Sequence, residues 1–202
     1  MSNLQSLEEL FVDKLKDVYD AEKRITKALP KMVKNASSEE LSAAFQEHLE
    51  QTQGHIERLD RIFENLGVTP GRKVCHGMMG LLEEGKELME QDGAAPVMDA
   101  AMIGAAQSVE HYEIASYGCL KTWAELLDKN EEAGLLKETL AEEEETDRKL
   151  TEIAKGINDV ARETEGDEDE SEDEEQMVAV RSGNGRSGGS SNSSSNSRKR
   201  SR

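Results

Sequence analysis

The sequence predicts an all-α protein, a bundle of four long helices with a short fifth helix on a long connection. Three observations lead to this fold class. Aromatic residues make up only 3% and charged residues 34% of the 202 residues, which suits helices packed through aliphatic side chains. Four stretches space their apolar residues as amphipathic helices do. Helix-stop signals divide the chain into five helices, two long, one short and two long, in that order.

Capping signals delimit the first two helices. The first is expected over about 4–34, where Ser6-Leu-Glu-Glu9 fits a capping box. The second is expected to begin at a second capping box, Ser37-Ser-Glu-Glu40, and to end near Leu66, where Gly67 stops it. Because the turn between them is short, the two helices should run antiparallel.

The second half of the bundle follows a long connection. This connection spans about 67–95 and carries a short helix at about 75–91. The third long helix is expected over about 97–127 and the fourth over about 131–161. Two antiparallel helix pairs with one long crossover are the ferritin-like arrangement of the four-helix bundle.

The composition changes at residue 163. Residues 163–175 hold ten acidic side chains and no basic one, and a Gly/Ser/Arg-rich stretch follows them. Such a segment lacks the apolar residues that a packed core requires. We therefore predict a bundle domain over 1–162 and a disordered C-terminal tail over 163–202.

Successive residues of a helix are about 100° apart, so the apolar residues of each long helix define the face that points into the bundle. On this face, each long helix also carries a side chain that can bind metal. Burying a carboxylate on such a face costs on the order of several kcal/mol of folding free energy, unless a cation or hydrogen bonds compensate its charge. Carboxylates with an imidazole suit iron or manganese, so the pattern predicts two metal ions, with iron favoured. The predicted ligands are Glu22, His48, Glu110, Glu113, Glu143 and Asp147.

This pattern departs from the usual dimetal set in two helices. Dimetal bundles take one Glu from each of two helices and Glu-x-x-His from each of the other two. Glu22 and Glu110 match the single ligands, whereas the fourth helix carries Glu143-x-x-x-Asp147 and the second has no Glu-x-x-His. In the alternative interpretation, His48 or lysines neutralise the buried carboxylates, or protons do so. No catalytic residue and no organic cofactor are assigned.

Charge and cysteine usage restrict the partners. A net charge of −18 repels nucleic acid and argues against it as a partner. No apolar stretch approaches the roughly 20 residues that a membrane span needs. Cys75 and Cys119 belong to no CxxC, and the first residues show no signal peptide, which together predict reduced thiols and a cytoplasmic protein.

Five stretches carry a resemblance to a known family: Val18–Ile25, Leu29–Met32, His48–Leu59, Val109–Gly118 and Leu136–Thr151. With these, about residues 4–157 resemble the YciE/YciF-type ferritin-like family, small dimetal carboxylate bundles that form no cage. The resemblance implies a homodimer, a dimetal site and a link to stress responses. Relatives carry a glutamate at the position of Gln51, and the glutamine removes a His48-x-x-Glu ligand pair.

Two functions remain open from the sequence. The first is a non-haem dimetal oxidoreductase, ferroxidase- or catalase-like, that handles Fe(II) with a small oxidant, either dioxygen or hydrogen peroxide, in stress protection. The second is a non-enzymatic stress or structural homodimer with a polar core and no catalytic turnover. The second predicts that Glu110→Ala keeps or raises stability without changing any activity.

Overall fold

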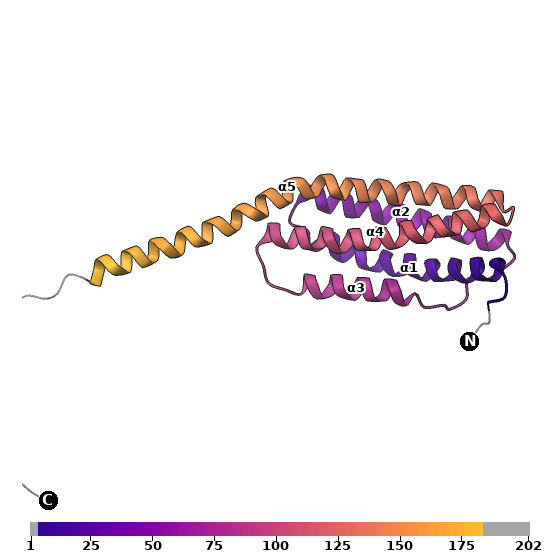
Figure 1. Cartoon of the computed structure of the whole chain (residues 1–202), viewed down its shortest axis with the longest axis horizontal. Helices are drawn as coiled ribbons and strands as arrows, with labels where there is room; N and C mark the ends of the chain where they lie inside the picture. Colours follow the sequence, from indigo (N-terminus) through magenta and orange to yellow (C-terminus); the bar gives the residue numbers. More distant parts are fainter. Residues whose placement is uncertain (1–3, 184–202) are drawn as a thin grey trace, which may run out of the picture. The chain divides into compact units, whose positions relative to one another are not determined.

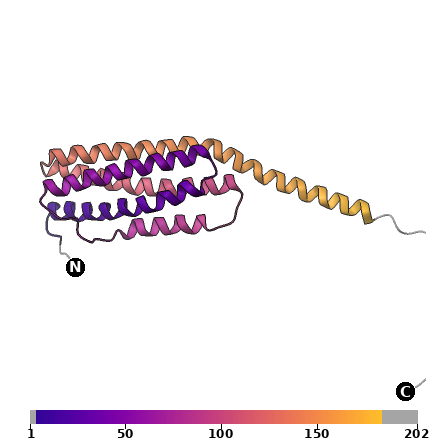
Figure 2. The same ribbon diagram turned by 180° about the vertical axis from the view of Figure 1, so that it is seen from behind.

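The computed structural model describes the backbone of residues 4–183 and the side chains of residues 4–163. Four long helices lie side by side, and a short helix lies against the outside of the bundle (Figures 1 and 2). No strand occurs among the described residues. The predicted fold class, a ferritin-like four-helix bundle whose long crossover carries a short helix, is confirmed. The helices are α1 (Leu7–Asn35), α2 (Glu39–Asn65), α3 (His76–Met89), α4 (Ala95–Leu126) and α5 (Asn130–Gly183).

Serine side chains cap the first two helices. Ser6 Oγ accepts a hydrogen bond from the backbone N–H of Glu9 at 3.1 Å, as the predicted capping box requires. At α2 the cap is Ser38, whose Oγ accepts from the backbone N–H of Leu41 at 3.3 Å. The second helix therefore begins one residue later than the predicted capping box places it.

Ser37 is engaged by Asp99 instead, and this contact joins the two halves of the bundle. The buried Asp99 carboxylate of α4 accepts from Ser37 N at 2.9 Å, from Ser37 Oγ at 2.5 Å and from Ser38 N at 2.8 Å. A carboxylate at a helix N-terminus satisfies free amides and is stabilised by the helix dipole. A residue of the second half thus completes the start of α2 in the first half.

The last helix is longer than the sequence predicts. We expected an end near Ala161, whereas α5 continues to Gly183. Glutamate is a strong helix former and no proline follows residue 161, so high charge alone does not end the helix. The chain divides into two units, Met1–Arg162 and Glu163–Arg202. Residues 184–202 of the predicted tail lie outside the described residues. None of the described helices has the length and apolar character of a membrane span.

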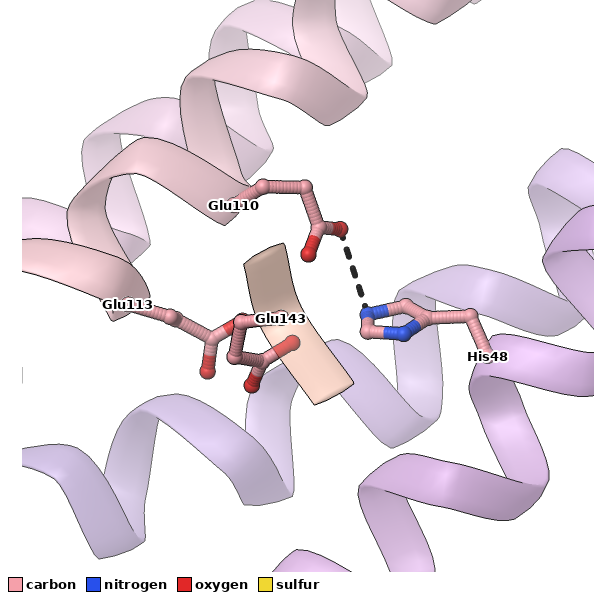
Figure 3. Close-up of side chains that lie close together, drawn as sticks. All are labelled: His48, Glu110, Glu113 and Glu143. Carbon is pink, nitrogen blue, oxygen red and sulfur yellow. Dashed lines mark ion pairs between the residues drawn. The ribbon is translucent and has the colours of Figure 1, made fainter. Parts of the chain in front are cut away.

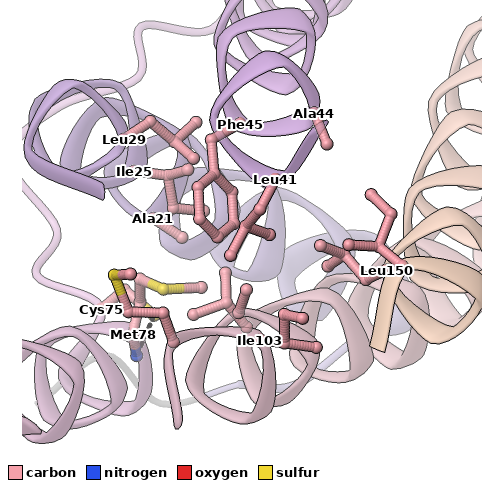
Figure 4. Close-up of a cluster of buried hydrophobic side chains, with 14 residues drawn as sticks. Ala21, Ile25, Leu29, Leu41, Ala44, Phe45, Cys75, Met78, Ile103 and Leu150 are labelled. Carbon is pink, nitrogen blue, oxygen red and sulfur yellow. Dashed lines mark hydrogen bonds between the residues drawn. The ribbon is translucent and has the colours of Figure 1, made fainter. Parts of the chain in front are cut away.

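Two clusters of buried apolar side chains fill the interior of the bundle. The first contains Phe45 and Leu150, together with Met78 of the short helix (Figure 4). The second contains Phe11 and Leu120 among others. Along α2, α4 and α5, buried polar residues separate the members of the two clusters in the sequence.

Side chains around Tyr112 fix the start of α3 against α1 and α4. Tyr112 Oη donates to Asp17 Oδ2 at 2.7 Å and lies 2.9 Å from Cys75 Sγ. The backbone N–H of Cys75 donates to Asp20 Oδ2 at 2.8 Å. Cys75 and Cys119 are both free thiols.

We expect Gly77→Ala to lower the free energy of unfolding by about 1–3 kcal/mol, the usual cost of overpacking. A Cβ at Gly77 would lie only 2.8 Å from Tyr112 Cε2, and the hydrogen bonds of Tyr112 oppose its retreat. Gly80→Ala is the matched control, because no described atom lies within 4 Å of its Cβ position and alanine favours a helix by up to about 1 kcal/mol. Urea unfolding measures both variants, and equal stabilities would contradict the expectation.

Candidate metal centre

Three helices bring four buried candidate ligands together at one place, which we call site 1. His48 comes from α2, Glu110 and Glu113 from α4, and Glu143 from α5 (Figure 3). One ligand atom from each lies within 4.8 Å of the others, and His48 Nε2 lies 3.2 Å from Glu110 Oε1. Because residues three apart share a helix face, Glu110 and Glu113 both reach the same space.

A second group, site 2, adjoins the first. It consists of Glu22 from α1, His55 from α2 and Glu143 from α5, again with ligand atoms within 4.8 Å of one another. His55 Nδ1 lies 3.2 Å from Glu143 Oε1 and 3.5 Å from Glu22 Oε1. Glu143 belongs to both sites, so one carboxylate lies where two neighbouring ions would share it.

The two sites collect the unsatisfied polar atoms of the interior. Eight buried side-chain nitrogen and oxygen atoms have no hydrogen-bond partner within the described part of the chain. Buried polar atoms in folded proteins nearly always have a partner, so eight exceptions in one place are compatible with metal binding. Carboxylate oxygens with imidazole nitrogens fit iron or manganese. All eight atoms belong to Glu22, His48, His55, Glu110, Glu113 and Glu143.

A charged pair outside site 2 orients His55. Its Nε2 lies 2.9 Å from Glu142 Oε2, and Arg58 donates to both oxygens of Glu142 at 2.7 and 2.6 Å. A carboxylate that accepts from one ring nitrogen fixes the tautomer of a metal-binding histidine and increases its basicity. With Nε2–H donated to Glu142, Nδ1 faces Glu22 and Glu143.

A hydroxyl orients His48 in the same way. Thr146 Oγ1 lies 3.4 Å from His48 Nδ1 and 3.1 Å from the carbonyl oxygen of Glu142. The hydroxyl can donate to the carbonyl and accept from Nδ1–H, which leaves the Nε2 lone pair toward Glu110. Thr146 also lies 3.3 Å from Gln51 Oε1, so Gln51 belongs to the surroundings of His48.

Burial sets the protonation of the site carboxylates. It raises the pKa of Glu110 and of Glu113 well above the ordinary value, and the neighbouring carboxylates of Glu143 and Glu22 raise them further. Burial also lowers the pKa of His48. Burial opposes the charge on His55, but the neighbouring carboxylates of Glu142, Glu143 and Glu22 outweigh it and raise that pKa to about 12. In the metal-free protein, protons therefore supply compensating charge, and metal ions would displace them.

The remaining predicted residue, Asp147, enters neither site. Its carboxylate accepts from Gln107 Nε2 at 3.1 Å and lies 3.4 Å from His111 Nε2. Four residues turn a helix by about 400°, which places Asp147 about 40° away from Glu143. The structure thus brings together five of the six predicted ligands and adds His55. Tyr117, on the same face as Glu110, donates its hydroxyl proton to Glu22 Oε1.

His55 is not among the ligands predicted above, although the sequence carries a signal for it. His48 and His55 are seven residues apart, so they lie about two turns apart on one face, and both are buried. No comparable signal marks Glu142, because its place on the helix is half-exposed and only contact with Arg58 reveals its role.

The bundle with one long crossover and a buried carboxylate–histidine cluster compatible with metal binding defines a ferritin-like protein. The chain belongs to the family described as a domain of unknown function, DUF892, whose model matches residues 6–163. This confirms the resemblance to YciE/YciF-type proteins.

Two relatives, YciF and YcfI, support this assignment. Protein YciF of Escherichia coli strain K12 is 49% identical over 166 residues, which cover 81% of this chain and 98% of YciF. The crystal structure of the E. coli stress protein YciF matches with a TM-score of 0.75 and 48% identity, over 77% of this chain and 99% of the other. YcfI from Rhodopseudomonas palustris matches with a TM-score of 0.72 and 43% identity, over 74% and 95% of the two chains. A dodecameric thioferritin from Bacteroides fragilis, 18% identical with a TM-score of 0.58 over 80% and 91%, shares the fold.

Proposed function

We propose that this protein binds two metal ions, iron in preference to manganese, and oxidises Fe(II) with a small oxidant, dioxygen or hydrogen peroxide. The observation that carries the proposal is the set of eight unpartnered buried atoms, all on the residues of sites 1 and 2. Two divalent cations would compensate the buried carboxylates.

The residues of the chain would hold and insulate the ions. Site 1 offers one imidazole and three carboxylates, and site 2 offers one imidazole and two carboxylates, with Glu143 common to both. A bound pair of redox-active ions supplies the electrons that reduce the oxidant. Arg58 keeps the Glu142 carboxylate on His55, and the apolar clusters on both sides keep water away, which strengthens every charge interaction at the centre.

The proposal includes a role in stress protection, since the similar YciF of E. coli is described as a stress protein. It also includes a cytoplasmic homodimer, which the sequence resemblance implies. Neither nucleic acid nor a membrane is part of it, in keeping with the net charge of −18.

Elemental analysis of protein purified without chelators tests the proposal. We expect about two ions of iron or manganese per chain, the number that a shared-carboxylate centre holds. After anaerobic loading with Fe(II), addition of air or of hydrogen peroxide should produce a ferric absorbance in the near ultraviolet. Background metal content, with no absorbance change beyond that of Fe(II) in buffer, would overturn the proposal and favour the non-enzymatic homodimer.

A further inference from the structure

An apolar cavity of about 40 Å³ lies against site 1. Its polar lining consists of His48, Glu110 and Thr146. The remaining lining is apolar and comes from all five helices. It includes Phe45 and Leu150, which are labelled in Figure 4.

The short helix α3 forms the outer wall of this cavity. Leu81, Leu82, Gly85 and Met89 contribute to the lining, and each is half-buried. The cavity thus lies between the crossover helix and the Nε2 atom of His48, one of the eight unpartnered atoms. Site 2 has no residue in the lining.

The volume of the cavity restricts its occupant to a very small molecule. A cavity of about 150 Å³ with apolar walls holds benzene or xenon, whereas a single water needs only about 10–15 Å³. A volume of about 40 Å³ is therefore too small for an organic substrate and sufficient for a diatomic gas. Away from His48, Glu110 and Thr146, the apolar lining leaves water without hydrogen-bond partners, so that part of the cavity stays dry.

The polarity of the walls separates the candidate oxidants. In the apolar part of the cavity hydrogen peroxide loses hydrogen bonds, which carries a large cost, and Fe(II) would likewise lose its hydration there. Dioxygen has no such bonds to lose. We propose that this cavity binds dioxygen beside His48 and Glu110, and that dioxygen reaches site 1 beneath α3. The proposal rests on the proposed function for the chemistry that follows binding, but the binding itself requires no metal.

Xenon is the probe that tests the cavity without metal. Crystals of the metal-free protein under xenon pressure should show xenon between α3 and His48. Ala106, which lines the cavity one turn before Glu110, provides the blocking variant Ala106→Leu. Ala115→Leu makes the same change at an exposed position of α4 and should leave xenon binding unchanged. Absence of xenon from the wild-type cavity would overturn the proposal.

Oxidation kinetics provide the second test. Ala106→Leu should slow Fe(II) oxidation by dioxygen several-fold, while oxidation by hydrogen peroxide and the affinity for Mn(II) stay near wild type. If Ala106→Leu does not fold, Gly85→Ala replaces it, because a Cβ there would lie 3.5 Å from Ala105 Cβ, an ordinary contact. If Ala106→Leu slowed oxidation by dioxygen and by hydrogen peroxide equally, the result would contradict the proposed role of the cavity in binding dioxygen. A failure of the proposed function would give a different result from a failure of the cavity proposal. Xenon would still bind to the metal-free protein, but neither the wild type nor any variant would bind Mn(II).

Discussion

Glu143→Gln should abolish most of the thermal stabilisation that metal ions give to this protein. A ligand at about 1,000 times its Kd adds about 4 kcal/mol per site, and a protein of this size gains about 2–4 °C of Tm per kcal/mol. Two filled sites should therefore raise the Tm of the wild type on the order of 20 °C. Because Glu143 contributes to both sites, its replacement by a neutral amide of similar shape weakens both.

Calorimetry of chelator-treated protein, with and without Mn(II), measures this effect. Glu22→Gln touches only site 2 and Glu110→Gln only site 1, so each should keep about half of the rise, as expected from one remaining site. Glu144→Gln, at the exposed neighbouring position, should keep all of it. A full rise in Glu143→Gln would show that the ions bind elsewhere.

Glu113→Leu should have opposite effects on the metal-free and metal-loaded proteins. Both oxygens of Glu113 are buried without a partner, and burial raises its pKa well above the ordinary value. A buried polar group without a hydrogen-bond partner costs about 1–3 kcal/mol, a cost that an apolar residue of similar volume avoids. We therefore expect a higher Tm without metal and a smaller rise with Mn(II), because site 1 loses a ligand.

Chemical denaturation with and without Mn(II) checks both signs. Glu125→Leu is the control, since it makes the same change at an exposed position of α4; it should not stabilise the metal-free protein and should keep the full response to Mn(II). A less stable metal-free Glu113→Leu would mean that the protein itself compensates this carboxylate. The non-enzymatic interpretation predicts no Mn(II) response in any variant.

The bundle could be predicted from the sequence because its signals are local. The apolar spacing, the Ser6 cap and the long crossover depend on neighbouring residues, which a helix places at known angles. The end of α5 was harder to predict, since no proline follows Ala161, Gly166 does not end the helix and glutamate favours its continuation.

The candidate site was predictable where its residues lie at the centre of an apolar face. Glu22, Glu110 and Glu143 lie there, and all three are buried together. Asp147 has a marginal angle, and its short side chain meets Gln107 instead. Contacts between helices, such as Arg58 with Glu142 and the cavity beside His48, depend on how side chains from several helices fit, and no periodicity in one helix contains that information.

The Asp99 contact has a consequence for how the chain folds. The first helix pair alone would leave the backbone N–H groups of Ser37 and Ser38 without the carboxylate that receives them. The helix that supplies this carboxylate lies beyond the crossover. Forming the contact therefore costs the conformational entropy that is lost when a long loop is closed. Neither antiparallel helix pair, α1–α2 or α4–α5, then makes this contact on its own. Because the contact needs no metal ion, we expect the two halves to unfold together in the metal-free protein.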